Sequence, residues 1–186
     1  MEWKDHSVLK EKHSLLSASN YAWLRYDDEK FERVYRSMKA KELGTRKHAL
    51  AAELISLGQK LPRTRQTLNM YVNDAIGFGM KPEVVLFYSM NAFGTADAIS
   101  FNRNLLRIHD LKTGVTKASM DQLKIYASYF CLEYNVKPGN IDMELRIYQN
   151  DDIFIEHPEA SDILPIIDKI ITFDKAANRL SEEDSL

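Results

Sequence analysis

The chain has 186 residues, enough for one domain with a substantial hydrophobic core. Its 25 basic and 27 acidic residues give a net charge of −2, so no overall basic field marks a nucleic-acid-binding protein, and any polyanion contact must be local. The single cysteine, Cys131, excludes an intramolecular disulfide framework, a cysteine-only zinc site and a four-cysteine iron–sulfur cluster. Because it stands in an apolar stretch, we expect a buried, inert thiol.

No apolar run approaches the roughly 18 residues of a membrane span, and the charged N-terminus lacks the apolar core of a signal peptide. We therefore expect a cytoplasmic protein that makes no membrane contact.

The first 80 residues are predicted to be helical. Residues 16–26 suggest a short serine-capped helix, and residues 29–43 are amphipathic at helical spacing. Gly44 is expected to separate that helix from a second one over 45–60, which Thr45 would cap. Residues 64–79 predict a third helix.

Short segments rich in β-branched and aromatic residues then predict a sheet over 82–157. Its strands are expected at these residues: 83–89, 92–102, 105–113, 141–150 and 153–157. The second and third should form a hairpin turning at "NRN", and a helix over 117–134 should precede the fourth.

A C-terminal helix is predicted within 158–180, broken or kinked near Pro165, before a frayed acidic tail. The whole order favours a single α/β domain over 1–186, bordering on α+β, with a central mixed sheet flanked by helices.

Asp110 and Lys112 lie two residues apart on the third predicted strand, so their side chains share one face. One interpretation is a surface ion pair, which contributes little to stability. The other is a functional pair, in which the carboxylate holds a divalent cation and the ammonium faces a developing negative charge.

Asp97 lies on the preceding strand of the predicted hairpin, so its carboxylate should approach that of Asp110. Taken alone it is typical of a turn aspartate, an interpretation that its combination with Asp110 and Lys112 disfavours. Two converging carboxylates repel each other, and a bound Mg²⁺ or Mn²⁺ relieves the repulsion. Gly94 then indicates a bulge or a place where another segment approaches the backbone closely.

These residues resemble the signature of the PD-(D/E)xK nuclease superfamily. "GTADAI" at 94–99 and "LLRIHDLKTG" at 105–114 are similar to the G-x-x-D and D-x-K-T-G elements of its RecB-type exonuclease branch. "ELGTRKHALAAELI" at 42–55 resembles the early G-x-x-x-H helix, and "QLKIYASYF" at 122–130 the later Gln-x-x-x-Tyr helix. The four elements occur in the family's order. Cysteines of the iron–sulfur relatives and a helicase P-loop are absent from the sequence.

The resemblance implies a restriction-endonuclease-like sheet and a Mg²⁺- or Mn²⁺-dependent deoxyribonuclease, more an exonuclease than a sequence-specific endonuclease. It assigns metal binding to four groups: His48, Asp97, Asp110 and the backbone carbonyl of Leu111. Lys112 would orient the attacking water or neutralise charge on the transition state. Gln122 and Tyr126 would brace the catalytic site or touch the DNA backbone.

Two further residues favour structural roles. Glu53 lies about 140° round the predicted helix from His48, which favours a surface or packing position. His109 should point to the face opposite Asp110 and Lys112.

A basic helical region offers the local patch that DNA would need. The residues expected to contact phosphates are Arg36, Lys39, Arg46, Lys47 and Lys117. Interspersed acids make a solvated helix face an equally good interpretation.

The expected partner is linear DNA, bound at its ends. By analogy with small nucleases of phages and mobile elements, a protein partner in recombination and an oligomer are also expectations. The competing hypothesis is a module on the nuclease fold that binds nucleic acid or a partner without cutting.

Overall fold

The computed structural model describes residues 14–183, and contacts divide the chain into two units, Met1–Leu43 and Gly44–Leu186. In the first unit a short 3₁₀ helix, η2 (Tyr21–Arg25), has Asn20 as its N-cap, and no side chain caps it. The predicted serine cap is therefore wrong. The indole N–H of Trp23 instead donates to the Ser17 carbonyl at 2.9 Å.

Helix α1 (Asp28–Ser56) is a single helix where the sequence predicted two. Gly44 and Thr45 lie inside it, so Gly44 ends no helix and Thr45 caps none. Glycine in a helix interior costs about 1 kcal/mol relative to alanine, which makes an interruption the natural expectation. Packing explains why a glycine stands at position 44, because a methyl group there would lie 2.7 Å from Thr113 Oγ1.

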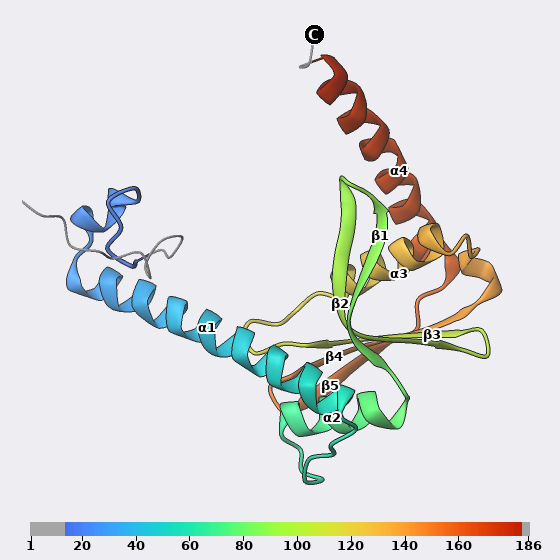
Figure 1. Cartoon of the computed structure of the whole chain (residues 1–186), viewed down its shortest axis with the longest axis horizontal. Coiled ribbons are helices and arrows are strands. Elements are labelled where there is room, and N and C mark those ends of the chain that lie inside the picture. The colour runs from blue at the N-terminus through green and yellow to red at the C-terminus, as the bar shows by residue number, and fades with distance from the viewer. Residues whose placement is uncertain (1–13, 184–186) are drawn as a thin grey trace, which may run out of the picture. The chain divides into compact units, whose positions relative to one another are not determined.

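Five strands form one sheet in sequence order, and they fall at the predicted places (Figure 1). They are β1 (Lys81–Ser89), β2 (Ala92–Asn102), β3 (Leu105–Leu111), β4 (Asp142–Gln149) and β5 (Asp152–Glu156). All neighbours are antiparallel except β3 and β4, which are parallel. The β2–β3 hairpin is confirmed, and its two turn residues, Arg103 and Asn104, both have positive φ.

Three further helices complete the second unit: α2 (Thr67–Gly77), α3 (Asp121–Glu133) and α4 (Ala160–Glu183). Helix α3 connects the two parallel strands, with a short 3₁₀ turn, η3 (Pro138–Asn140), before β4. Helix α4 runs unbroken through Pro165, so the predicted break is wrong. The helix also continues past residue 180; residues 184–186 lie outside the described part.

Side chains from the two faces of the sheet form two separate cores. On one face Leu106 and Ile108 join residues of α3, together with Ile163 of α4. On the other, Ala98 and Leu111 join residues of α1 and α2. A mixed sheet flanked by helices confirms the predicted α/β class. Within residues 14–183, no helix is long and apolar enough to cross a membrane.

Cys131 is buried as expected, and burial raises the pKa of its thiol to about 11. Such a thiol is almost wholly protonated at neutral pH and therefore a poor nucleophile.

His109 is fully buried, with its ring edge-on to Phe78 and Nδ1 at 3.3 Å from the Tyr148 hydroxyl. Its Nε2 has no hydrogen-bond partner among the described residues. Burial, with help from the nearby guanidinium groups of Arg146 and Arg107, lowers the pKa of His109 to about 3. The ring is therefore neutral in the folded protein.

This burial predicts a pH-dependent stability. The unfolded chain protonates His109 near pH 6.5, and the folded chain does so only near pH 3. The contribution to stability is therefore complete above pH 6.5 and is lost as pH falls, by up to about 1.4 kcal/mol per unit. Urea unfolding at several pH values should show a weaker pH dependence for His109→Gln than for the wild type. The exposed His157→Gln is the matched control; equal slopes for all three proteins would contradict the prediction.

Candidate active site

The sheet opens between β2 and β3 at Asp97. The last pair of the β2–β3 ladder is Ala98 with His109, whereas β2 continues to pair with β1 as far as Ala92. Strand β3 continues beside β4 to Leu111. Figure 1 shows the β1–β2 hairpin diverging from β3 and β4 here. Backbone groups that lose a ladder partner at such a place must find another acceptor or donor.

The Asp97 carboxylate supplies one such acceptor. Its Oδ2 accepts a hydrogen bond from the Leu111 N–H at 2.9 Å. The same oxygen lies 3.2 Å from Nδ1 of His48, which reaches it from α1. Gly44, one helical turn before His48, lets α1 lie against Thr113, two residues after the end of β3.

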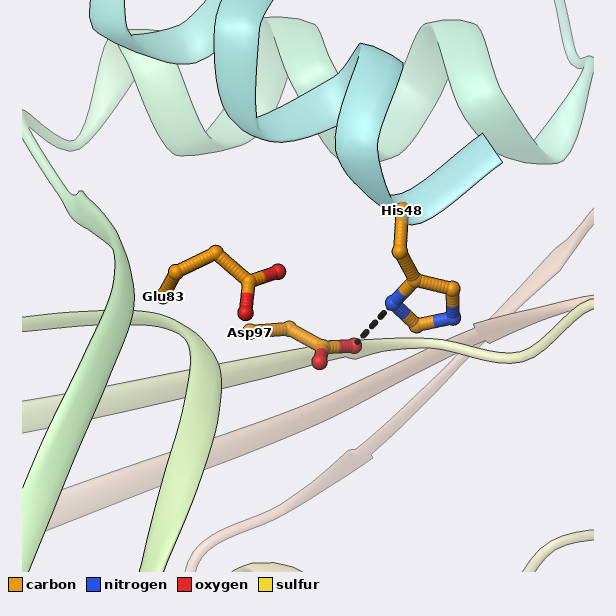
Figure 2. Close-up of side chains that lie close together, drawn as sticks. All are labelled: His48, Glu83 and Asp97. Atoms are coloured by element: carbon orange, nitrogen blue, oxygen red, sulfur yellow. Dashed lines mark ion pairs between the residues drawn. The ribbon is translucent and has the colours of Figure 1, made fainter. Parts of the chain in front are cut away.

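A third ligand-type side chain, Glu83 of β1, joins this pair. Ligand atoms of His48, Glu83 and Asp97 all lie within 4.8 Å of one another. Figure 2 shows that the three side chains come from α1, β1 and β2 and point toward one common space. Glu83 has a φ of 51°, a conformation that costs a side-chain-bearing residue about 1–2 kcal/mol. We call these three residues the His48–Glu83–Asp97 cluster.

Glu83 is absent from the sequence-predicted site. What identifies Glu83 is the β1–β2 register. Pro82 pairs with Ala98 and Val84 with Ala96, which places Glu83 opposite Asp97. Both strands were predicted, but their pairing was not. An exposed glutamate near the start of a strand is otherwise unremarkable in a sequence.

Asp110 is buried beside this cluster, and Lys112 binds it. Lys112 Nζ donates to Asp110 Oδ1 at 3.0 Å and lies at the same distance from Oδ2. That second oxygen accepts no hydrogen bond from the described residues, although it is buried. Lys112 Nζ also donates to Gln122 Oε1 at 2.7 Å, and Gln122 Nε2 donates to the Tyr126 hydroxyl at 3.1 Å.

One chain of hydrogen bonds therefore runs from β3 to α3 through four side chains: Asp110, Lys112, Gln122 and Tyr126. Gly94 permits it, because a methyl group there would lie 2.9 Å from Tyr126 Cε1. The predicted close approach at Gly94 is confirmed.

The pKa shifts reflect burial together with crowded negative charge. Burial, reinforced by the Asp97 carboxylate, raises the pKa of Asp110, and Lys112 only partly opposes this. Burial and Asp97 likewise raise the pKa of Glu83. The hydrogen bond to Asp97 raises the pKa of His48 against the effect of burial. A bound cation would remove the repulsion between these carboxylates.

The donor set fits a divalent cation. Carboxylate oxygens with one imidazole nitrogen suit Mn²⁺ and Mg²⁺, and the buried Asp110 Oδ2 lacks a hydrogen-bond partner in the described chain. Of the four predicted metal-binding groups, the structure places His48 and Asp97 in contact and Asp110 beside them, bound to Lys112. Leu111 contacts Asp97 through its N–H, not through the carbonyl that the resemblance assigns to the metal.

The predicted phosphate-binding residues fall into both units. In the first, Arg36 donates to Glu32 at 3.0 Å and Lys39 to Glu42 at 3.0 Å, as on a solvated helix face. In the second, Arg46 and Lys47 are exposed on α1 next to His48, and Lys117 is exposed after β3. Lys47 and Lys112 line one cavity of about 260 Å³ together with these residues: Thr67, Leu68, Leu111, Thr113, Asn150 and Asp151.

No protein-family model matches the chain, and neither a curated protein nor a solved structure matches it significantly. The site must therefore be interpreted from its own geometry.

The cluster predicts a metal affinity that depends on Glu83. Replacing it by glutamine removes one anionic ligand, so Mn²⁺ binding should weaken on the order of tenfold or more. Isothermal titration calorimetry measures this directly. Glu53→Gln, an exposed glutamate on the same helix as His48, is the matched control and should bind as the wild type does. Equal affinities for the two variants would exclude Glu83 as a ligand.

Proposed function

We propose that this protein is a metal-dependent deoxyribonuclease that hydrolyses phosphodiester bonds. One observation carries the proposal: the His48–Glu83–Asp97 cluster adjoins a buried carboxylate whose partner is Lys112. A cation bound next to a fixed ammonium group would supply positive charge of the kind that stabilises the transition state of phosphodiester hydrolysis.

The cluster and Asp110 would hold Mg²⁺ or Mn²⁺. When bound, such an ion lowers the pKa of its water ligand and polarises the phosphate. His48 must then be neutral at Nδ1, the nitrogen that faces Asp97. Asp110 Oδ2 is in ion-pair contact with Lys112 Nζ at 3.0 Å but accepts no hydrogen bond from the described residues, and a carboxylate oxygen has a second lone pair with which it could bind the ion.

Lys112 would act on the attacking water or on a phosphate oxygen. An ammonium group has three N–H donors. Asp110 and Gln122 occupy two of them, which leaves one for the substrate. Gln122 fixes the direction of that third donor, and Tyr126 fixes Gln122 in turn. These two residues are therefore positioning residues.

The resemblance to the PD-(D/E)xK superfamily, RecB-type branch, supports the more specific part of the proposal. On that basis we propose an exonuclease that acts at the ends of linear DNA in recombination or processing, in the cytoplasm. A recombination partner and an oligomeric state belong to the same proposal. Arg46 and Lys47, adjacent to His48, supply a local positive charge for the DNA backbone.

Cleavage of labelled linear DNA in Mn²⁺ tests the proposal. Wild-type protein should degrade the DNA, and a chelator should stop the reaction. Asp110→Asn and Lys112→Ala should each lower the rate by about 10²–10³-fold while DNA binding remains. Asp168→Asn and Lys169→Ala, on the exposed part of α4, are the matched controls and should cleave normally.

The hypothesis of an enzyme would be refuted if the wild-type protein neither cleaved DNA nor bound Mn²⁺ in calorimetry. DNA binding without cleavage would favour the non-cutting module.

The positioning role of Gln122 makes a separate prediction. Gln122→Leu removes the acceptor for Lys112, so kcat should fall by about tenfold with little change in KM or Mn²⁺ affinity. Gln122→Glu retains an oxygen acceptor at that place and should restore most of the rate. Steady-state kinetics on one oligonucleotide measures both. Equal losses for the two variants would contradict a positioning role.

A further inference from the structure

The outer face of the β1–β2 hairpin is apolar and exposed. Its large side chains are Val85, Phe87, Met90 and Phe93, with 56%, 44%, 79% and 54% of their surface exposed. The alternate residues Leu86 and Ala96 are fully buried in the core. Phe87 and Phe93 are paired across the strands, with ring centroids 6.4 Å apart. Exposed apolar patches of this kind mark interaction sites. We call this surface the hairpin face.

The hairpin that carries this face is held in place. At its tip, the Ser89 hydroxyl and the Asn91 amide both donate to Asp174 Oδ1 of α4, at 2.6 and 2.9 Å. On its inner side, Tyr126 of α3 packs against Gly94. The exposed phenylalanines are therefore presented on a fixed element. A fixed surface loses little conformational entropy on binding.

Strand addition by another chain is disfavoured at this place. Strand β1 is an edge strand, and such edges commonly pair with a second chain. Here Glu133 of α3 already accepts the hydrogen bond of the Phe87 N–H, at 2.8 Å. Strand addition at this point would have to break that hydrogen bond, whereas binding to the side-chain face leaves it intact.

The hairpin face continues directly from the candidate active site. Glu83 precedes Val85 on β1, and Asp97 follows Phe93 on β2, so the same two strands carry both features. Asp97 lies four residue steps along the extended strand from Phe93, a distance of about 13 Å. The paired positions between them, Val85 and Thr95, are uncharged. A DNA strand whose phosphate lies at the cluster can thus place neighbouring bases on this face.

Aromatic side chains bind unpaired bases by stacking, whereas a duplex keeps the faces of its bases covered. We propose that the hairpin face is a base-stacking platform for single-stranded DNA, with Phe87 and Phe93 as the stacking residues. The active site would then take an unpaired DNA end. This inference rests on the proposed nuclease function and specifies its substrate.

Fluorescence anisotropy with labelled oligonucleotides tests the platform without turnover. Every protein carries Asp110→Asn so that the DNA stays intact. The double variant Phe87→Ser/Phe93→Ser should bind a single strand about tenfold more weakly than the parent. Its affinity for a blunt duplex should not change. Phe173→Ser, which replaces a phenylalanine of α4 that is 62% exposed, is the matched control and should bind as the parent does.

An oligonucleotide with abasic positions gives a second readout that needs no change at the hairpin. The parent should bind it about as weakly as the double variant binds the intact strand. The double variant should bind the abasic oligonucleotide no more weakly than it binds the intact strand. This comparison decides the question even if the double variant fails to fold, which thermal melting would reveal.

Three results would overturn the platform: unchanged single-strand binding by a folded double variant, equal loss of duplex binding, or abasic DNA bound as tightly as intact DNA. A parent dimer that the double variant converts to monomer in light scattering would instead assign the face to contact between copies. Failure of the nuclease proposal has a different signature, since wild-type protein would then leave linear DNA intact in Mn²⁺ whatever the hairpin binds.

Discussion

The site depends on one interruption in the sheet, the separation of β2 from β3 at Asp97. In a continuous ladder Asp97 would pair with Asp110 inside a closed sheet. Here the backbone of β2 leaves, and the Asp97 carboxylate accepts the Leu111 N–H in its place. A buried N–H without an acceptor would be costly, so the hydrogen bond from the Leu111 N–H keeps the Asp97 side chain in this position. The opening that results is where His48 and Glu83 enter.

Two glycines allow helices to reach that opening from the two faces of the sheet. Gly44 brings α1, and with it His48, against the end of β3. Gly94 lets Tyr126 of α3 lie across β2, which places Gln122 next to Lys112. Neither glycine is needed for a turn. Both remove a side chain where two elements pack closely, a use of glycine that resembles its use at ligand sites.

Much of the fold followed from local pattern. All five strands, α2 and α3 were predicted within a few residues, since alternation and turn residues specify them. The errors have physical causes. The low helix propensity of Gly44 predicts a helix end, but α1 continues through it at a place where a side chain would crowd Thr113. A break at Pro165 does not occur, because proline removes only one hydrogen bond of α4, and Ile163 and Ile167 on either side of it pack into the core.

The sequence by itself determined the residue types and their order: an Asp on one strand, Asp110 and Lys112 on the next, and a polar pair one turn apart on a helix. It did so because spacing along a strand or helix decides which side chains share a face. Only the tertiary structure decided that Glu83 lies opposite Asp97, that β2 leaves β3, and that the hairpin exposes its phenylalanines. These features depend on register and on contacts between distant segments, which no local pattern encodes.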